Sequence, residues 1–260
     1  MALVVMERDG PVATLTLNRP EARNALSTAL CDAISTALER FDDRSGACVL
    51  VLRGEGPVFC SGADLAAVSG AEGMGFLPAF ERMLSRVFRF PLPTIAAIHG
   101  AALGGGLQLA TVCDFRIAAD DAKLGIPSSR LGIVVNFENV ERLVLLAGVA
   151  RAKEVLMTGR TYTGAEAAVA GLVHQAVPVG GLERDVSELA RDIASLAPMS
   201  VRGAKAAIQV VVEKLGSARI SDPEGVTQID DLVAGAYASE DLAEGMRAMV
   251  EKRPPRFKGR

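Results

Sequence analysis

The sequence has no tryptophan and two tyrosines among its 260 residues, and its lysines and arginines form no basic block. Nucleic-acid-binding surfaces combine clustered positive charge with aromatic side chains on which bases stack. This composition therefore argues against a nucleic-acid partner. Half of the residues are hydrophobic and 23% are charged, with a formal net charge of -3. Such a chain is long and apolar enough to fold around one large core.

Metal-binding and disulfide patterns are also missing. The two histidines are His99 and His174, and the cysteines at positions 31, 48, 60 and 113 form no CxxC pair. No local spacing brings these side chains together as metal ligands. We therefore predict no metal site, and reduced thiols as in a cytoplasmic protein.

Long apolar runs without breakers are lacking too. The longest uncharged stretch, 90–113, contains Pro91, Pro93 and Gln108 together with several glycines. A buried strand, a turn and a helix start explain this stretch better than a membrane span does. The first ten residues mix acidic and basic side chains and show neither a basic n-region nor an apolar h-region, so we expect no signal peptide and a cytoplasmic location.

What is present is an alternation of strand and helix patterns in the first half. Val12–Leu17 alternates apolar residues with threonine, and Ala47–Leu52 is apolar throughout, which indicates two strands. Between them, apolar residues recur every three to four positions over Leu26–Phe41, which indicates a helix. A second round predicts a helix at 76–87, a strand at 94–98, a helix from 104 and a strand at 113–118. This alternation predicts an α/β fold.

The second half reads as mostly helical after residue 137. We expect helices at 137–147, 150–157, 164–169, 181–195, 200–214, 224–236 and 240–250, with one short strand at 173–177. Ser239 is a suitable N-cap for the last helix. We predict a core at 1–197 and a helical oligomerisation region at 198–260.

Two turns rich in small residues are candidates for chemistry. Gly104–Gly106 follows a predicted strand and opens a helix, where bare N–H groups at the positive end of the helix dipole suit an anion or a developing oxyanion. Tight packing that needs glycine explains the run equally well. A second turn, FCSGADL at 59–65, follows the strand that ends at Leu52. One N–H group from each turn could converge on a single carbonyl oxygen.

These turns belong to a set of eight motifs: NRPEARNAL (18–26), FCSGADL (59–65), HGAALGGGLQLA (99–110), CDFRIAA (113–119), AKLGIP (122–127), TGRTYTGAEA (158–167), GLV (171–173) and SEDLAEGMRAMVEKRPPRF (239–257). In order and spacing, the whole chain resembles the enoyl-CoA hydratase/isomerase (crotonase) family. The resemblance implies a spiral of ββα repeats with a C-terminal helical trimerisation region, assembled as a homotrimer or homohexamer. It also implies an acyl-CoA ligand, with coenzyme A as part of the substrate and no permanently bound cofactor.

The resemblance also assigns roles to residues. It places an oxyanion hole at the backbone N–H groups of Ala63 and Gly105. It implies that coenzyme A contacts the segment around Arg23, the backbone of Ala63, Asp64 and Leu65, and Phe257 or a nearby lysine of a neighbouring subunit. Arg23 could equally be an ordinary exposed arginine.

The family's two hydratase glutamates are replaced here. Gln108 stands two residues after the glycine run, and Ser128 follows the proline of AKLGIP. Neither can exchange a proton near neutral pH, so the two-carboxylate mechanism is missing. The position of the isomerase acid is Asn136, an amide. Glu138 could be a displaced base or an acidic first-turn residue that suits the helix dipole. Glu141, one helical turn further along, could also be a displaced base, but because Arg142 follows it we expect it at the helix surface or in a salt bridge.

Two classes of function remain open. The first is an enzyme that forms an enolate from a CoA thioester, as a weak hydratase, an isomerase, a decarboxylase or a hydrolase, because one oxyanion hole serves all four reactions. The second is a non-catalytic acyl-CoA-binding protein. We expect His99 and His174 to be structural.

Overall fold

The computed structural model describes residues 2–41, 46–64, 73–219 and 223–259. The chain divides into two compact units. Unit 1 comprises Met1–Leu124 and Tyr162–Gln209, and unit 2 comprises Gly125–Thr161 and Val210–Arg260. A boundary between residues 197 and 198 stays a prediction.

A six-stranded sheet forms the centre of unit 1, in the order β1-β2-β3-β4-β6-β9. Its strands are β1 (Val4–Asp9), β2 (Val12–Leu17), β3 (Val49–Gly54), β4 (Thr94–Ile98), β6 (Phe115–Ala119) and β9 (Gln175–Val177). β1 and β2 form an antiparallel hairpin, and the remaining neighbours pair in parallel. Parallel neighbours need crossover connections, and helices supply them. The predicted α/β class is confirmed.

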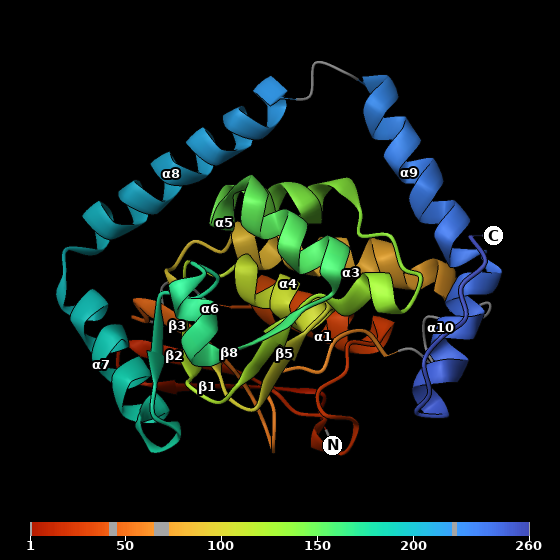
Figure 1. Cartoon of the computed structure of the whole chain (residues 1–260). Helices are drawn as coiled ribbons and strands as arrows, with labels where there is room; N and C mark the ends of the chain where they lie inside the picture. The colour runs from red at the N-terminus through yellow and green to blue at the C-terminus, as the bar shows by residue number, and fades with distance from the viewer. Residues whose placement is uncertain (1, 42–45, 65–72, 220–222, 260) are drawn as a thin grey trace. The chain divides into compact units, whose positions relative to one another are not determined.

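The helices of unit 1 cover this sheet and carry the chain between its strands (Figure 1). They are α1 (Thr28–Glu39), α3 (Gly73–Phe88), α4 (Gly105–Thr111), α6 (Gly164–Val169) and α7 (Leu182–Ser195). On α7, Leu182, Val186 and Ala190 share one face. This face packs against side chains of the sheet that include Val51 of β3 and Ala97 of β4. The apolar face of the helix and the apolar face of the sheet thus form one layer of the core.

Short elements complete unit 1. A three-stranded sheet has the order β5-β7-β8, with β5 at Ala101–Leu103, β7 at Lys123–Gly125 and β8 at Thr161–Thr163. Single 3₁₀ turns lie at η1 (Pro20–Ala22), η2 (Pro127–Arg130) and η3 (Val179–Gly181), of which η2 belongs to unit 2. β5 matters for the site, because it leads directly into α4.

Unit 2 is helical. It contains α5 (Phe137–Thr158), α9 (Pro223–Tyr237), α10 (Glu240–Val250) and the end of α8 (Pro198–Arg219). α5 consists of two helices that meet at a kink at Gly148, whose φ of 77° is not helical, in agreement with the helices predicted at 137–147 and 150–157. Ser239 caps α10 as predicted, since its Oγ accepts a hydrogen bond from Leu242 N at 3.0 Å. Among the described residues, no helix is long and apolar enough to span a membrane.

Candidate active site

The two glycine-containing turns lie side by side in unit 1. Cys60 N donates to Ala101 O at 3.0 Å, and Leu103 N donates to Cys60 O at 3.1 Å. The turn at 60–64 therefore runs parallel to β5, which ends where α4 begins. A Cβ atom on Gly106 would lie 2.4 Å from Cys60 O, so the close approach of the turn to α4 requires glycine at position 106.

This packing brings the peptide groups of Ala63 and Gly105 near each other. A Cβ atom on Gly62 would lie 3.7 Å from Gly105 N, and one on Gly104 would lie 4.0 Å from Gly62 Cα. Among the hydrogen bonds between described residues, none uses the N–H group of Ala63 or of Gly105. Gly105 is also the first residue of α4, where the helix dipole is positive. Two backbone donors on adjacent turns are thus left for another acceptor.

Apolar side chains surround these donors. A Cβ atom on Gly105 would meet Leu26 Cδ1 at 3.2 Å and the Phe80 ring at 3.3 Å. Phe80 stacks on Phe76 with ring centroids 5.4 Å apart, and all three side chains are buried. Hydrogen bonds and charges act more strongly in such surroundings than in water.

The turn at 60–64 is held from its other side by the NRPEARNAL segment. Leu26 N donates to Gly62 O at 2.7 Å, and Asp64 N donates to Leu26 O at 2.8 Å. The Asp64 carboxylate accepts a hydrogen bond from Arg19 Nη1 at 2.6 Å. Asp64 was predicted to act through its backbone, and its pairing with Arg19 was not predicted. Residues 45 positions apart give no local signal of an ion pair.

The remaining predicted residues of unit 1 have different surroundings. Gln108 lies on α4, three residues after Gly105, and is 8% exposed. The side chain of Arg23 is exposed, its φ is 53°, and its carbonyl accepts a hydrogen bond from Ser61 N at 3.1 Å. Leu65 lies outside the described residues.

Ser128, Asn136 and Glu138 belong to unit 2. Ser128 is half-buried in η2, and its carbonyl accepts hydrogen bonds from Leu131 N and Ile133 N at 2.9 and 3.0 Å. Asn136 is the N-cap of α5, and its Oδ1 accepts from Asn139 Nδ2 at 2.6 Å. Glu138 is exposed in the first turn of α5, where a negative charge suits the helix dipole.

Glu141 differs from the exposed or ion-paired residue that was expected. Its Oε1 atom is buried and has no hydrogen-bond partner among the described residues. The neighbouring Arg142 donates instead to Asn139 Oδ1 at 2.9 Å. Successive helix residues point in different directions, so a Glu-Arg pair at i and i+1 does not predict a salt bridge. Glu141 is therefore a half-buried side chain with one carboxylate oxygen shielded from water.

The two histidines make contacts with the backbone of unit 1. His99 Nε2 lies 2.9 Å from Gly56 O. His174 Nδ1 accepts from Arg116 N at 3.2 Å, and burial together with the nearby Arg116 charge lowers the pKa of His174. Arg116 is itself 3% exposed and donates to Cys113 O at 2.6 Å. These contacts agree with structural roles for both rings.

The cysteines are free thiols, and three of them are buried. Burial raises the pKa of Cys31, Cys60 and Cys113 to about 12, so these side chains stay protonated at neutral pH and are poor nucleophiles. Across the described part of the chain, no group of three or more histidine, cysteine or acidic side chains could hold a metal ion.

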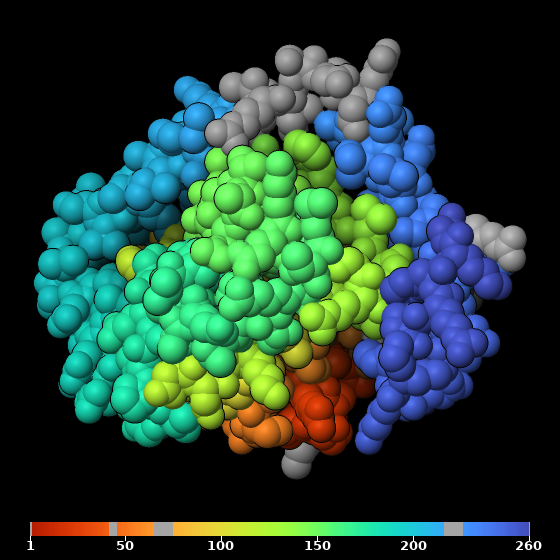
Figure 2. Space-filling model, in the orientation of Figure 1, coloured from red at the N-terminus to blue at the C-terminus, as the bar shows by residue number. Residues whose placement is uncertain are grey.

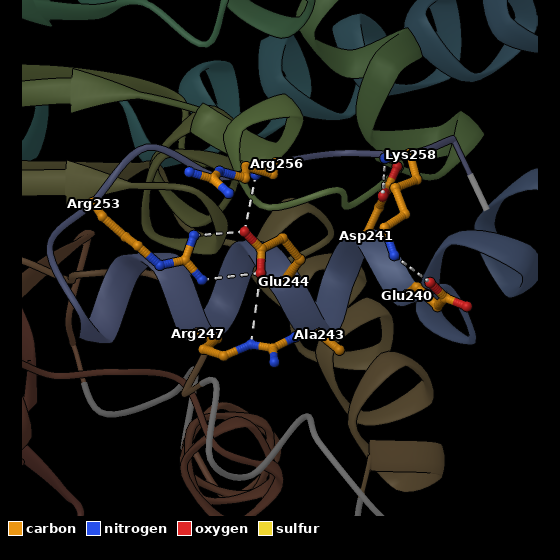
Figure 3. A pocket seen from close by; sticks show the side chains of 8 residues that line it. All are labelled: Glu240, Asp241, Ala243, Glu244, Arg247, Arg253, Arg256 and Lys258. Carbon is orange, nitrogen blue, oxygen red and sulfur yellow. Dashed lines mark hydrogen bonds and ion pairs between the residues drawn. The ribbon is translucent and has the colours of Figure 1, made fainter.

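The C-terminal tail runs back along α10 in unit 2 (Figure 1), and Figure 2 shows both as one dark-blue surface. Figure 3 shows Glu244 at the centre of their contacts: it accepts from Arg253 Nη1 at 2.6 Å, from Arg253 Nη2 at 3.0 Å and from Arg256 N at 2.9 Å. The hydrogen bonds from Arg253 and from Arg256 N lower the pKa of Glu244 to about 2. Phe257, also on the tail, is 41% exposed.

A hollow of about 700 Å³ lies beside these contacts. It is lined by charged residues and one alanine: Glu240, Asp241, Ala243, Glu244, Arg247, Arg253, Arg256 and Lys258.

Substituting Glu244 with glutamine should release the tail from α10. At neutral pH the Arg256–Phe257 bond of Glu244→Gln should be cut by trypsin faster than that of the native chain. Because the folded pKa of Glu244 is depressed, its contribution to stability is present above its ordinary pKa of 4.5 and is lost as the pH falls toward about 2. The difference in unfolding free energy between the native chain and the variant should shrink over that window.

Glu251→Gln is the matched control for this experiment. Glu251 also accepts a hydrogen bond from Arg253, but it does not contact Arg256 and is 49% exposed. The control should be cleaved at the native rate. Equal cleavage of Glu244→Gln and the native chain would contradict the anchoring role of Glu244.

Comparison with known proteins shows the family of the chain. The model of the enoyl-CoA hydratase/isomerase family matches residues 7–260. A probable enoyl-CoA hydratase of Bacillus subtilis is 37% identical over 264 residues, which cover 100% of both chains. The match is therefore not confined to one motif.

Solved structures are also similar to the chain. The enoyl-CoA hydratase of Bacillus anthracis is 36% identical, with a TM-score of 0.76 over 99% of this chain and 100% of that one. Methylmalonyl-CoA decarboxylase in complex with 2S-carboxypropyl-CoA is 26% identical, with a TM-score of 0.89 over 99% of this chain and 98% of that one. The predicted crotonase-like fold with a helical C-terminal region is confirmed, and the chain belongs to the enoyl-CoA hydratase/isomerase family.

Proposed function

We propose that this protein binds an acyl-CoA thioester and stabilises its enolate with the backbone N–H groups of Ala63 and Gly105. One observation carries the proposal: these donors lie on adjacent turns, in apolar surroundings, and bond to no other described residue. Each such donor in a preorganised site is worth about 3 kcal/mol to a developing oxyanion. The acyl-CoA is the substrate, and no permanently bound cofactor is required.

The same proposal includes weak or absent hydration of 2-enoyl-CoA. Adding water across the double bond needs one group to take a proton from water and another to give one to the enolate. Gln108 and Ser128 stand where the resemblance puts these two groups, and neither titrates near neutral pH. Loss of general acid–base help costs a factor of about 10²–10⁴ in rate.

Decarboxylation of a short carboxyacyl-CoA is the second candidate. When the C–C bond to the carboxylate breaks, CO₂ leaves and the electron pair passes to the thioester oxygen as an enolate. The two N–H donors suffice for this step, and a proton is taken up at carbon afterwards. The observation that favours it is that Gln108 and Ser128 supply neither an acid nor a base, and this step needs neither of them to form the enolate.

Contacts to coenzyme A and self-assembly extend the proposal. The exposed Arg23 lies next to the turn at 60–64 and is suited to a phosphate, and Phe257 would reach the ligand of a neighbouring subunit. Assembly as a homotrimer or homohexamer is supported by exposed apolar side chains along α8, namely Met199, Ile208 and Val211. The mass of the particle in solution tests this assembly.

The function is tested by giving the native chain three ligands: 2-trans-butenoyl-CoA, a medium-chain 2-trans-enoyl-CoA and methylmalonyl-CoA. Calorimetry should show binding of at least one of them, and absorbance of the conjugated thioester should decline slowly or not at all. Release of CO₂ from methylmalonyl-CoA would support the decarboxylase. Binding without any turnover would support the non-catalytic acyl-CoA-binding protein.

Two results would contradict this proposal. If no acyl-CoA binds, the donors at Ala63 and Gly105 serve another purpose. If the native chain hydrates enoyl-CoA at ordinary enzyme rates, the proton transfers must take place although positions 108 and 128 hold Gln108 and Ser128. Glu138 and the half-buried Glu141 would then be the first residues to replace by glutamine.

A further inference from the structure

We propose that Arg19 is a positioning residue, which sets the direction of the Ala63 N–H group through its ion pair with Asp64. The inference rests on the proposed function, because the direction of this N–H group matters if it receives an oxyanion. Arg19 does not act on Ala63 directly; it holds the turn through Asp64, the next residue along the chain.

The direction of each donor follows from the carbonyl in the same peptide group. A trans peptide is planar, so the N–H of Ala63 points opposite to the C=O of Gly62. Gly62 O accepts a hydrogen bond from Leu26 N at 2.7 Å, which turns the Ala63 N–H away from the segment at 23–26. Gly104 O likewise accepts from Leu107 N and Gln108 N, each at 3.1 Å, so the Gly105 N–H points out of the start of α4.

The Leu26–Gly62 hydrogen bond depends on an unusual local conformation. Arg23 and Asn24 both have φ of 53°, in the left-handed region that non-glycine residues seldom occupy. Asn24 is fully buried, and its Nδ2 donates to Glu55 O and Val58 O, each at 2.9 Å. Its Oδ1 accepts from Arg19 N at 3.0 Å. Tertiary contacts thus maintain the bend that presents Leu26 to the turn.

The Arg19 side chain joins the two segments on either side of this bond. Its Nη1 donates to Ala25 O at 3.1 Å and to Asp64 Oδ2 at 2.6 Å. Ala25 precedes Leu26, and Asp64 follows Ala63, so one nitrogen joins the two segments beside the Leu26–Gly62 hydrogen bond. The side chains of Arg19 and Asp64 are 25% and 18% exposed, which shields their attraction from water more than at an open surface.

Removing the Arg19 guanidinium should therefore let the two segments separate and rotate the Ala63 peptide. A carbonyl bound between two aligned N–H donors is polarised, and its stretching frequency falls. With one donor misaligned, the frequency should move back toward that of the free thioester. Affinity should change less, because it reports on all contacts of the ligand, whereas the carbonyl shift reports on the two N–H donors alone.

The experiment uses the full chain and 2-trans-butenoyl-CoA labelled with ¹³C at the thioester carbonyl. Difference infrared spectroscopy gives the carbonyl shift on binding, and calorimetry gives the affinity. Arg19→Met should lose most of the shift, whereas Arg19→Lys should keep most of it, since lysine supplies a cation to Asp64. Asp64→Asn removes the same ion pair from its other side and should lose part of the shift.

Arg82→Met is the matched control. Arg82 pairs with Asp32 at the same 2.6 Å distance, but both side chains are about half exposed, and the pair joins α3 to α1. The control should retain the full carbonyl shift. Loss of the shift in Arg82→Met as well would overturn the proposal, because it would show that any broken ion pair of unit 1 disturbs the site.

The outcomes separate this inference from the proposed function. A native chain that binds the probe without a carbonyl shift would overturn both. A native shift that survives in Arg19→Met would overturn the positioning role and leave the oxyanion hole standing. If Arg19→Met does not fold, Asp64→Asn and Arg19→Lys decide: full shifts in both would overturn the role of the ion pair, and a reduced shift in Asp64→Asn beside a retained shift in Arg19→Lys would support it.

Discussion

Replacing Gln108 and Ser128 together by glutamate should raise the hydration rate of 2-trans-butenoyl-CoA by about 10²–10⁴-fold over the native chain. The resemblance assigns both positions to one water molecule, with one carboxylate as base and the other as acid. The oxyanion donors of the scaffold would then work with the proton transfers that the native sequence lacks. Loss of the conjugated thioester absorbance measures the rate.

The environments of the two positions decide which variants are informative. Gln108 is 8% exposed on α4, so a glutamate there is partly desolvated and its pKa should rise toward the operating pH. Ser128 is half-buried in η2, whereas its neighbour Ser129 is exposed. Gln108→Glu combined with Ser129→Glu is therefore the matched control, because it adds the same charge one residue away.

Each single variant should gain less than the double variant, since one carboxylate supplies one of the two proton transfers. Equal rates for the Ser128 and Ser129 combinations would contradict the assignment of position 128. A folded double variant that binds butenoyl-CoA without hydrating it would show that the native scaffold does not hold the thioester as a hydratase does.

Much of the fold could be predicted because long elements carry long patterns. Val12–Leu17, Thr94–Ile98 and the helix at 240–250 were identified from periodicity and an N-cap, and the structure agrees with them. Strands β5 and β7 have three residues each, too few for any period to show. β1 was missed because Glu7, Arg8 and Asp9 make its second half read as a polar loop.

The candidate site could be predicted only where it depends on the backbone. Glycine runs mark places where chains approach closely, and the contact of Gly106 with Cys60 is of that kind. The pairing of Arg19 with Asp64 and the partial burial of Glu141 depend on tertiary structure and leave no local pattern. Sequence reasoning therefore selected the two turns but not the contacts that hold them.

Substituting Gly106 with alanine should lower the free energy of unfolding by about 3 kcal/mol, the upper range for overpacking a well-packed interior. The new Cβ atom would lie 2.4 Å from Cys60 O and 2.9 Å from Cys60 Cβ. Neither side can yield cheaply, because Cys60 forms backbone hydrogen bonds with Ala101 and Leu103 of the strand that leads into α4. The turn and the helix must move apart.

Gly203→Ala is the control that isolates this contact. Gly203 is exposed on α8, and a Cβ atom there would meet nothing within 4 Å, so alanine should stabilise the helix by up to about 1 kcal/mol. Denaturant unfolding measures both variants, and the carbonyl shift of bound butenoyl-CoA should vanish in Gly106→Ala alone. A Gly106→Ala chain with native stability and a native shift would mean that the turn at 60–64 does not touch α4, and the two donors would then have no reason to converge.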